Sequence, residues 1–293
     1  MKGCCSFLLY TINTIVLCSF LFLIAIIKFL IPIGFVTKFC TKALIFIATL
    51  WISINSFNIR LFHKIDFDVR GLDKLERKQW YLVLSNHQSW VDILVLQKIF
   101  NRKIPMLKFF LKKELIWVPF LGLAWWALDF PFMKRYSKKF IENHPHLKGK
   151  DFEKTKKACK KFKTTPVSIM NFVEGTRFAQ TKKIKANGGF ENLLPPKAGG
   201  VAFVLGSMGG SLHKIIDVTI VYPGKIPSFW EFICGKTKKI IIDLQIIPVT
   251  DFLTGDFFGD KIFKDEFCDW LNSLWQEKDR RIQKLLIENK NLH

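Results

Sequence analysis

The chain has 293 residues, of which 49% are hydrophobic, including 30 Phe and 9 Trp. This composition is too apolar for a disordered chain and favours a globular protein that associates with a membrane. Lysine and arginine number 45 against 24 acidic residues. The resulting formal net charge of +21 indicates an anionic partner, such as nucleic acid, lipid headgroups or a phosphorylated substrate. Seven cysteines without a C-x-x-C pair argue against a zinc site or a disulfide framework.

An uncharged apolar segment covers residues 6–27. As a helix, this segment would extend about 33 Å, which matches the thickness of a bilayer core. A cleaved signal peptide is the main alternative, but its apolar core is shorter and no A-x-A cleavage site follows the segment here. We therefore predict a helix that is retained in the membrane.

A second apolar run, residues 43–54, is short for a span and is typical of an interfacial or re-entrant helix. Lys28, Lys38 and Lys42 lie between the two runs, whereas only Lys2 precedes the first. This excess of positive charge predicts that the linker and the chain after it face the cytoplasm. Because two full spans would carry the chain back across the bilayer, we predict one span with an interfacial helix, or two helices embedded in one leaflet.

The remainder of the chain alternates strand patterns with helix patterns, which predicts an α/β sandwich. No repeat or low-complexity linker interrupts it, so we divide the chain into membrane-anchoring helices (1–58) and one larger domain (59–293). The strands are predicted at residues 79–86, 166–175, 214–223 and 238–249. The helices are predicted at residues 89–100, 151–162, 197–208 and 265–289.

The segment LSNHQSWVDILVL, residues 84–96, places His87 and Asp92 between a predicted strand and a predicted helix. In one interpretation, Ser89 caps the helix, Asp92 occupies the capping-box position and His87 is an ordinary loop residue. In the other, Asp92 accepts a hydrogen bond from one imidazole nitrogen of His87 and leaves the second nitrogen free as a general base. That geometry requires His87 in the turn before the helix, because side chains five positions apart on one helix diverge by about 140°. The residues alone leave the two interpretations balanced.

Three further segments suit an anionic ligand. In NFVEGTRF, residues 171–178, Gly175 permits a sharp turn and Arg177 can bind a phosphate through two hydrogen bonds. Arg135 follows an aromatic run, and Lys197 precedes a Gly-Gly pair at a predicted helix start. The alternatives are an ordinary turn with a solvated arginine, a basic interfacial edge with aromatic anchoring, and a helix cap.

Four ordered blocks resemble the glycerolipid acyltransferases, the family of 1-acyl-glycerol-3-phosphate acyltransferases. The blocks are NHQSWVD (86–92), DFPFMKR (129–135), FVEGTR (172–177) and VTIVYP (218–223). They cover about residues 80–225, and the first carries the family's H-x4-D motif. The segments LDFPFMKRYSK and PPKAGG look most like the branch with the YihG-type and lysocardiolipin acyltransferases. The second block lacks the family's glycine-rich run, which puts the usual shape of the acceptor pocket in doubt.

The resemblance implies a glycerol-3-phosphate acyltransferase-like αβ sandwich and a role for each matched residue. His87 is expected to be the general base that deprotonates the hydroxyl of a lysophospholipid, and Asp92 is expected to orient the imidazole and stabilise its cation. Pro223 is expected to shape the acyl-chain site. The residues expected to bind the substrate are Arg135, Glu174, Gly175, Thr176, Arg177 and Lys197.

The resemblance also implies a membrane-bound O-acyltransferase with no bound cofactor or metal and an acyl-CoA or acyl-carrier-protein thioester as co-substrate. The expected acceptor is lysophosphatidic acid, and the alternative is another anionic lysolipid such as lysophosphatidylglycerol or lysocardiolipin. An anionic membrane surface is an expected partner, whereas nucleic acid is not, because the sequence has no zinc-finger, RNP or basic-zipper pattern. The competing classes are a membrane-tethered protein that binds anions without catalysis and a metal-dependent lipid hydrolase. The active site is expected on the cytoplasmic face of a bacterial inner membrane, or of the endoplasmic reticulum in a eukaryote.

Overall fold

The computed structural model describes residues 2–133, 162, 165–186 and 188–290. Arg135 and nearly all of the helix predicted at residues 151–162 lie outside the described residues.

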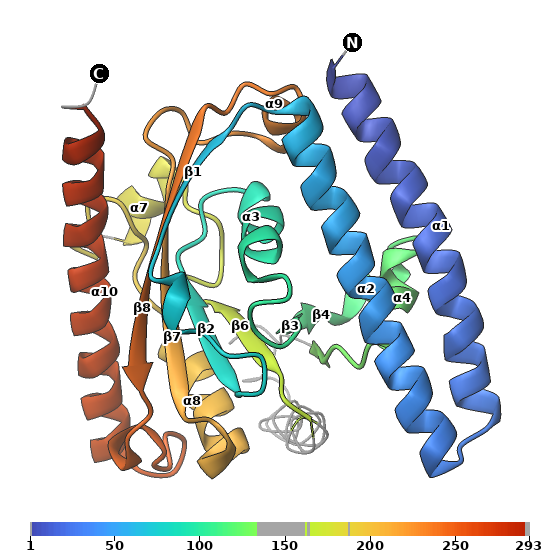
Figure 1. Cartoon of the computed structure of the whole chain (residues 1–293). Coiled ribbons are helices and arrows are strands. Elements are labelled where there is room, and N and C mark those ends of the chain that lie inside the picture. The colour runs from blue at the N-terminus through green and yellow to red at the C-terminus, as the bar shows by residue number, and fades with distance from the viewer. Residues whose placement is uncertain (1, 134–161, 163–164, 187, 291–293) are drawn as a thin grey trace.

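Two apolar helices, α1 (Lys2–Leu30) and α2 (Gly34–Phe62), form an antiparallel hairpin along one side of the molecule (Figure 1). Each is long and apolar enough to cross a membrane. The expectation that the run at residues 43–54 is a short element is wrong, because this run is the middle of a helix of 29 residues. The division of domains after residue 58 stays a prediction, and α2 itself continues to Phe62.

Polar side chains inside the hairpin explain why α2 is longer than its apolar run. Asn55 accepts a hydrogen bond from the side chain of Asn13 at 2.7 Å, and Asn58 accepts one from Ser6 at 3.0 Å. These pairs satisfy polar groups between two apolar helices and fix the register of α1 against α2. The outward side of the hairpin, in contrast, exposes large apolar side chains, including Phe7, Phe20, Leu23, Phe29, Phe35 and Phe46.

A six-stranded mixed sheet forms the centre of the domain, with strand order β1-β8-β7-β2-β6-β3. Its neighbours run parallel except for the antiparallel pair β7 and β8. All four predicted strands are present, and the predicted α/β class is confirmed. The strands are β1 (Asp66–Arg70), β2 (Tyr81–Ser85), β3 (Leu107–Phe109), β6 (Ser168–Phe172), β7 (Lys214–Val221) and β8 (Lys239–Pro248). A separate parallel pair consists of β4 (Leu111–Lys112) and β5 (Phe132–Met133).

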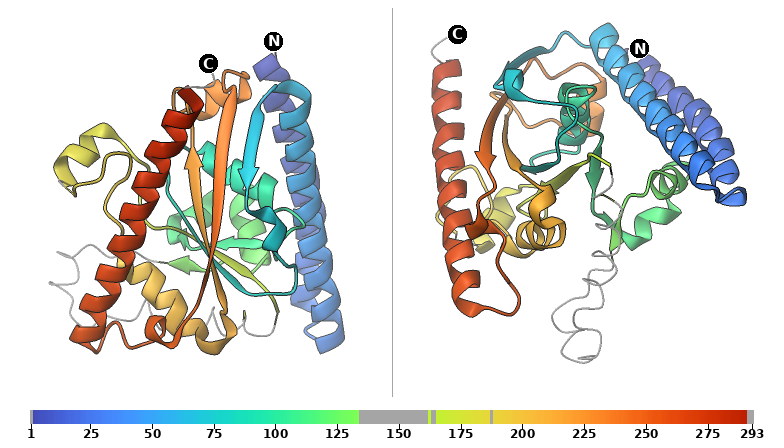
Figure 2. Two further views of the ribbon diagram at one scale, coloured as in Figure 1. Left: turned by 60° about the vertical axis from the view of Figure 1, so that its left-hand side comes forward. Right: turned by 60° about the horizontal axis from the view of Figure 1, so that its bottom comes forward.

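Helices cover both faces of the sheet (Figure 2). Strand β2 is buried on both sides, as expected for the middle of a largely parallel sheet. Leu82 and Leu84 pack with α8 (Ala198–Met208) and α10 (Lys261–Lys290), whereas Tyr81 and Val83 pack with α3 (Val91–Phe100) on the opposite face. The hairpin lies beyond α3, so it covers the same side of the sheet. The short helices are η1 (Leu72–Lys74), η2 (Lys113–Trp117), α4 (Leu121–Ala127), α7 (Gln180–Ala186), η4 (Gly209–Ser211), α9 (Phe229–Ile233) and η5 (Asp251–Leu253).

Three parallel strands end at the same edge of the sheet. Ser85, the last residue of β2, is in register with Phe172 of β6 and with Val218 of β7. The segments that follow these strands therefore meet at one edge, where ligands bind in open α/β sheets.

A buried ion pair fastens the C-terminal helix to the centre of the sheet. Lys278 of α10 is fully buried, and its Nζ lies 2.6 Å from Oδ1 of Asp217 in β7. The same ammonium donates to the carbonyl oxygen of Val218 at 2.6 Å. Arg281 Nη1 lies 3.3 Å from the second carboxylate oxygen of Asp217. A buried pair of this kind is costly to break, because the remaining charge stays in the interior.

Asp217→Asn should therefore lower the free energy of unfolding by about 3–5 kcal/mol, since it leaves the ammonium of Lys278 buried without its counter-charge. Asp269→Asn changes an exposed carboxylate on α10 and should alter the value by less than about 0.5 kcal/mol. Chemical denaturation in detergent measures both variants. Equal unfolding free energies for the two would contradict this account of how α10 is attached.

Candidate active site

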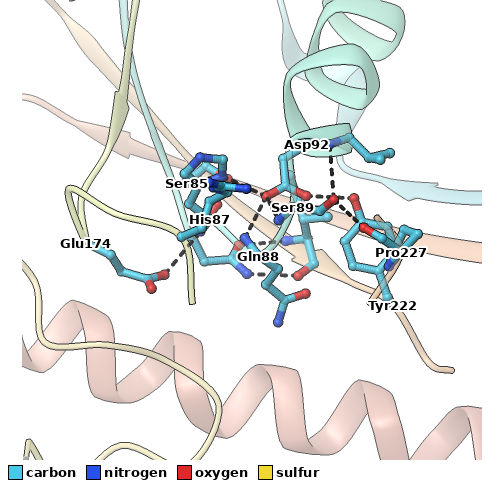
Figure 3. A network of polar contacts seen from close by, with 12 residues as sticks. Ser85, His87, Gln88, Ser89, Asp92, Glu174, Tyr222 and Pro227 are labelled. Atoms are coloured by element: carbon cyan, nitrogen blue, oxygen red, sulfur yellow. Dashed lines mark hydrogen bonds and ion pairs between the residues drawn. The ribbon is translucent and has the colours of Figure 1, made fainter. Parts of the chain in front are cut away.

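His87 and Asp92 form a hydrogen-bonded pair at the edge of the sheet where β2 ends (Figure 3). His87 lies in the turn after β2, and Asp92 lies in the first turn of α3. The imidazole Nδ1 is 2.9 Å from Oδ2 of Asp92. The Asp92 side chain is fully buried, whereas that of His87 is 11% exposed. The geometry is therefore the one in which the turn brings the two side chains together.

Asp92 also organises the start of α3. Its Oδ2 accepts the backbone N–H groups of Gln88 at 2.6 Å and Ser89 at 2.9 Å. Ser89 uses its hydroxyl to accept the N–H of Val91 at 3.2 Å and to donate to the carbonyl of Pro227 at 2.5 Å. The N-cap residue of α3 is Trp90, without a side-chain capping hydrogen bond, so the prediction that Ser89 caps the helix is wrong by one residue. Asp92 still accepts the Ser89 N–H, so the carboxylate that holds His87 also holds the turn before the helix.

The contacts of His87 define which nitrogen is free. An ionised carboxylate only accepts hydrogen bonds, so Nδ1 carries the proton and Nε2 keeps its lone pair. The ring of Phe172, at the end of β6, stacks on the imidazole with centroids 3.9 Å apart and planes 15° apart. Phe172 and Asp92 together fix the plane and the orientation of the imidazole.

A largely apolar cavity of about 410 Å³ lies beside the histidine, between the hairpin and the domain. His87 and Phe172 line it from the sheet edge, Leu21 and Ala48 from the hairpin, and Trp125 from α4. A cavity of this size and lining suits a hydrocarbon chain.

The turn after β6 packs directly on the segment that carries His87. The N–H of His87 donates to Glu174 Oε1 at 3.1 Å, and Phe178 N–H donates to the carbonyl of His87 at 2.7 Å. The second oxygen of Glu174 accepts the N–H of Leu194 at 3.4 Å. Glu174 is 1% exposed, so its carboxyl group supports the backbone of both segments. The next residue, Gly175, has a φ of +67°, a conformation that favours glycine.

Three cationic side chains surround this turn. The guanidinium of Arg177 lies 4.5 Å from the ring centroid of Trp90, and Lys182 Nζ donates to Thr176 Oγ1 at 2.6 Å. Lys197 lies close to Gly175: a Cβ added to Gly175 would be 3.1 Å from the Nζ of Lys197. The cluster provides positive charge and hydrogen-bond donors for a phosphate.

The structure brings together all of the candidate residues that it describes: His87, Asp92, Glu174, Gly175, Thr176, Arg177 and Lys197. Arg135 lies outside the described residues, and Pro223 is not part of the cavity lining. Sequence reasoning missed Trp90, Phe172, Lys182 and Tyr222 as parts of the site. Trp90, Phe172 and Tyr222 lie inside the four blocks, but their contacts with the site could not be read from the blocks alone. Lys182 lies outside the blocks and reaches Thr176 from the helix α7.

In the described part of the chain, no group of three His, Cys, Asp or Glu side chains is placed to hold a metal ion.

The chain is similar to curated acyltransferases over most of its length. It is 26% identical over 238 residues to mouse 1-acyl-sn-glycerol-3-phosphate acyltransferase epsilon, which covers 74% of this chain and 60% of that protein. It is 26% identical over 215 residues to the human gamma enzyme, covering 69% and 52%. Mouse lysocardiolipin acyltransferase 1 is 25% identical over 227 residues, covering 72% and 56%. The chain thus spans between half and two thirds of the length of these relatives.

Among solved structures, the 1-acyl-sn-glycerophosphate acyltransferase PlsC from Thermotoga maritima matches with a TM-score of 0.47 and 15% identity, covering 94% of this chain and 97% of that chain. The family model described as Acyltransferase matches residues 66–223, which is more than half of the chain and includes the His87–Asp92 pair and the turn of Glu174. The chain belongs to the acyltransferase family.

Proposed function

We propose that this protein transfers an acyl group from an acyl thioester to the free hydroxyl of a lysophospholipid, with lysophosphatidic acid as acceptor and phosphatidic acid as product. The observation that carries the proposal is the position of His87. Its imidazole is held by Asp92 at 2.9 Å and lines the apolar cavity. Its backbone carbonyl accepts a hydrogen bond from Phe178, which follows the cationic turn. The names of the mouse epsilon and human gamma relatives support a 1-acylglycerol-3-phosphate acceptor.

The chemistry needs only the side chains of the pair. His87 Nε2 takes the proton of the acceptor hydroxyl while the hydroxyl oxygen attacks the thioester carbonyl. The ester C–O bond forms, the C–S bond breaks, and the imidazolium returns the proton to the leaving thiolate. Asp92 stabilises the imidazolium between these steps and keeps its Nδ1–H in place. A thioester is an activated acyl donor, so positioning and one general base suffice.

The apolar cavity is suited to the acyl chain. Each buried methylene contributes about 0.8 kcal/mol, so a fatty acyl chain in this cavity would hold the donor firmly. We propose that a chain seated there has its thioester carbonyl beside His87, which forms part of the cavity lining. This arrangement applies equally to an acyl-CoA and to an acyl-carrier-protein donor.

The cationic turn is suited to the acceptor phosphate. Arg177 supplies a planar fork of donors, and Trp90 holds that fork by stacking at 4.5 Å. Lys182 donates to the Thr176 oxygen, which leaves the Thr176 hydroxyl proton available to a phosphate oxygen. Lys197 adds charge beside Gly175. We keep Arg135 in the proposal as a further phosphate contact on the strength of its motif.

Glu174 is proposed to position these groups and not to contact substrate. Burial raises the pKa of its carboxyl to about 8, against the opposing effect of the His87 and Leu194 N–H groups. A buried group with these partners ties the catalytic segment to the phosphate-binding turn.

The exposed apolar side of the hairpin is proposed to contact the membrane. The domain packs along both helices, through α4 and α9 against α1 and through α3 against α2. A helix pair covered by protein on one side and apolar on the other fits two helices embedded in one leaflet. The net charge of +21 would favour an anionic surface, and the cytoplasmic face remains the proposed location.

A second candidate acceptor is another anionic lysolipid, such as lysocardiolipin or lysophosphatidylglycerol. The match to mouse lysocardiolipin acyltransferase 1 favours it, as does the absence of the family's glycine-rich run from WWALDFPFMKR. Initial rates with a panel of lysolipids, each with acyl-CoA and with acyl-carrier-protein donors, would rank the acceptors and donors.

His87→Ala should lower acyl transfer to lysophosphatidic acid by about 10²–10⁴-fold, because it removes the general base. The measurement is transfer of a labelled acyl group by the protein in membranes. His213→Ala changes an exposed histidine far from Asp92 in the sequence and should retain full activity. Unchanged activity of His87→Ala, with normal insertion of the protein, would overturn the mechanism.

Arg177→Gln should raise the KM for the phosphate-bearing acceptor by about 10- to 100-fold, since it removes charge-assisted hydrogen bonds. The KM for the acyl donor should not change. Arg280→Gln removes an exposed arginine from α10 and serves as the matched control. An increase in donor KM alone would contradict the assignment of Arg177 to the acceptor.

Glu174→Gln should make stability less dependent on pH. The unfolded chain loses the Glu174 proton near the ordinary pKa of 4.5, whereas the folded protein keeps it to a pH of about 8. Between these values the unfolded state binds fewer protons, so the wild type loses stability as pH rises from about 4.5 to about 8. In Glu174→Gln, the altered hydrogen bonds lower the stability by the same amount at every pH. This variant lacks the loss of stability that the wild type shows as pH rises. Thermal unfolding of both proteins at pH 5 to 9 tests the prediction. A difference in Tm between them that stays the same at every pH would contradict it.

A further inference from the structure

We infer that Tyr222 is a positioning residue for the His87–Asp92 pair, because it holds the carboxylate oxygen that the histidine does not use. This inference rests on the proposed function. The Tyr222 hydroxyl donates to Asp92 Oδ1 at 2.6 Å, and Tyr222 is only 4% exposed (Figure 3).

The two oxygens of Asp92 have unequal partners. Oδ2 receives His87 Nδ1 and the N–H groups of Gln88 and Ser89, at 2.9, 2.6 and 2.9 Å. Within the described residues, Oδ1 receives only the hydroxyl of Tyr222. A carboxylate whose hydrogen bonds all converge on one oxygen can still rotate about its Cβ–Cγ bond. The Tyr222 hydroxyl opposes this rotation and satisfies a buried oxygen that would otherwise lack a partner.

The position of Tyr222 is itself fixed by the first block. Asn86, next to His87, donates its side-chain amide to the carbonyl of Ile220 and accepts the Ile220 N–H, both at 2.9 Å. This reciprocal pair locks the end of β7 against the end of β2, two residues before Tyr222. The hydroxyl of Tyr222 therefore reaches Asp92 from the residue that follows β7, and the pair is supported by β2, α3 and β7 together.

Tyr222 donates and does not take part in proton transfer. Burial and the neighbouring charge of Asp92 raise the pKa of its phenol well above the ordinary value. The hydroxyl stays protonated throughout the working range of an enzyme, so it remains a donor. By sharing the charge of Asp92, this hydrogen bond also limits how strongly the carboxylate favours the imidazolium form of His87.

The charged and titratable groups around the pair come from the elements already described. Glu174 lies in the turn after β6, and its carboxyl accepts the His87 N–H. Arg177 lies farther along that turn and stacks on Trp90. Lys278 approaches Glu174 from α10. A change at Tyr222 leaves these groups in place, so its effect on the titration of His87 can be isolated.

The test is Tyr222→Phe, which removes one oxygen and keeps the ring. We expect kcat to fall by about 10- to 100-fold, as for loss of a hydrogen bond to a charged group, with KM for donor and acceptor unchanged. The acid limb of kcat/KM should move to higher pH, because Asp92 no longer shares its charge with the phenol. Tyr81→Phe is the matched control: it removes another buried phenol oxygen, from β2, whose partner is the N–H of Glu76.

A second readout needs no substrate. Diethyl pyrocarbonate reacts with unprotonated imidazole, so the pH dependence of His87 modification, followed by mass spectrometry, reports the protonation of His87 directly. Its midpoint should be higher in Tyr222→Phe than in the wild type and in Tyr81→Phe. A midpoint that does not move would overturn the positioning role, whatever the kinetics show. A shifted midpoint in a wild-type protein that acylates no lysolipid would uphold the role of Tyr222 and reject the proposed function.

Discussion

The site depends on the hydrogen bonds that the buried carboxylate of Asp92 accepts. This carboxylate holds the imidazole of His87 at 2.9 Å and, through the same oxygen, two N–H groups of the turn before α3. A change that displaced the helix would therefore displace the base as well. Burial strengthens this coupling, because a charge in the interior must be matched by donors in fixed positions. The ends of β2, β6 and β7 provide those positions, since the three parallel strands end at one edge of the sheet.

The surroundings of the pair differ on its two sides. On one side, the hairpin and α4 enclose an apolar cavity with His87 in its lining. On the other, the turn after β6 presents cations that suit a phosphate, and Glu174 joins that turn to the backbone of His87. The proposed reaction needs this division, because it brings together an acyl chain and a phosphorylated alcohol. The hairpin thus has two uses: it completes the cavity and offers its outer side to the membrane.

Much of the domain could be predicted from local patterns, because its central strands are continuous apolar runs. Strand β1 was missed because its short, half-exposed segment carries no such run. The length of α2 was missed because Asn55 and Asn58 look like the end of an apolar helix, and only their partners on α1 explain them. The motif residues of the site were found from spacing and order. The contact of Tyr222 with Asp92 joins segments 130 residues apart, which no local pattern reveals. The contact of Lys182 with Thr176 is local, but Lys182 lies outside the four blocks.

The neutral His87 imidazole should carry its proton on Nδ1 and leave Nε2 free. Nitrogen-15 NMR of the histidine-labelled protein in detergent measures this directly, with the His87 signals assigned by their loss in His87→Ala. We expect the shift of a protonated nitrogen at Nδ1 and that of an unprotonated nitrogen at Nε2. The opposite assignment would show that Asp92 does not hold the imidazole as described, and it would contradict the role of His87 as the base.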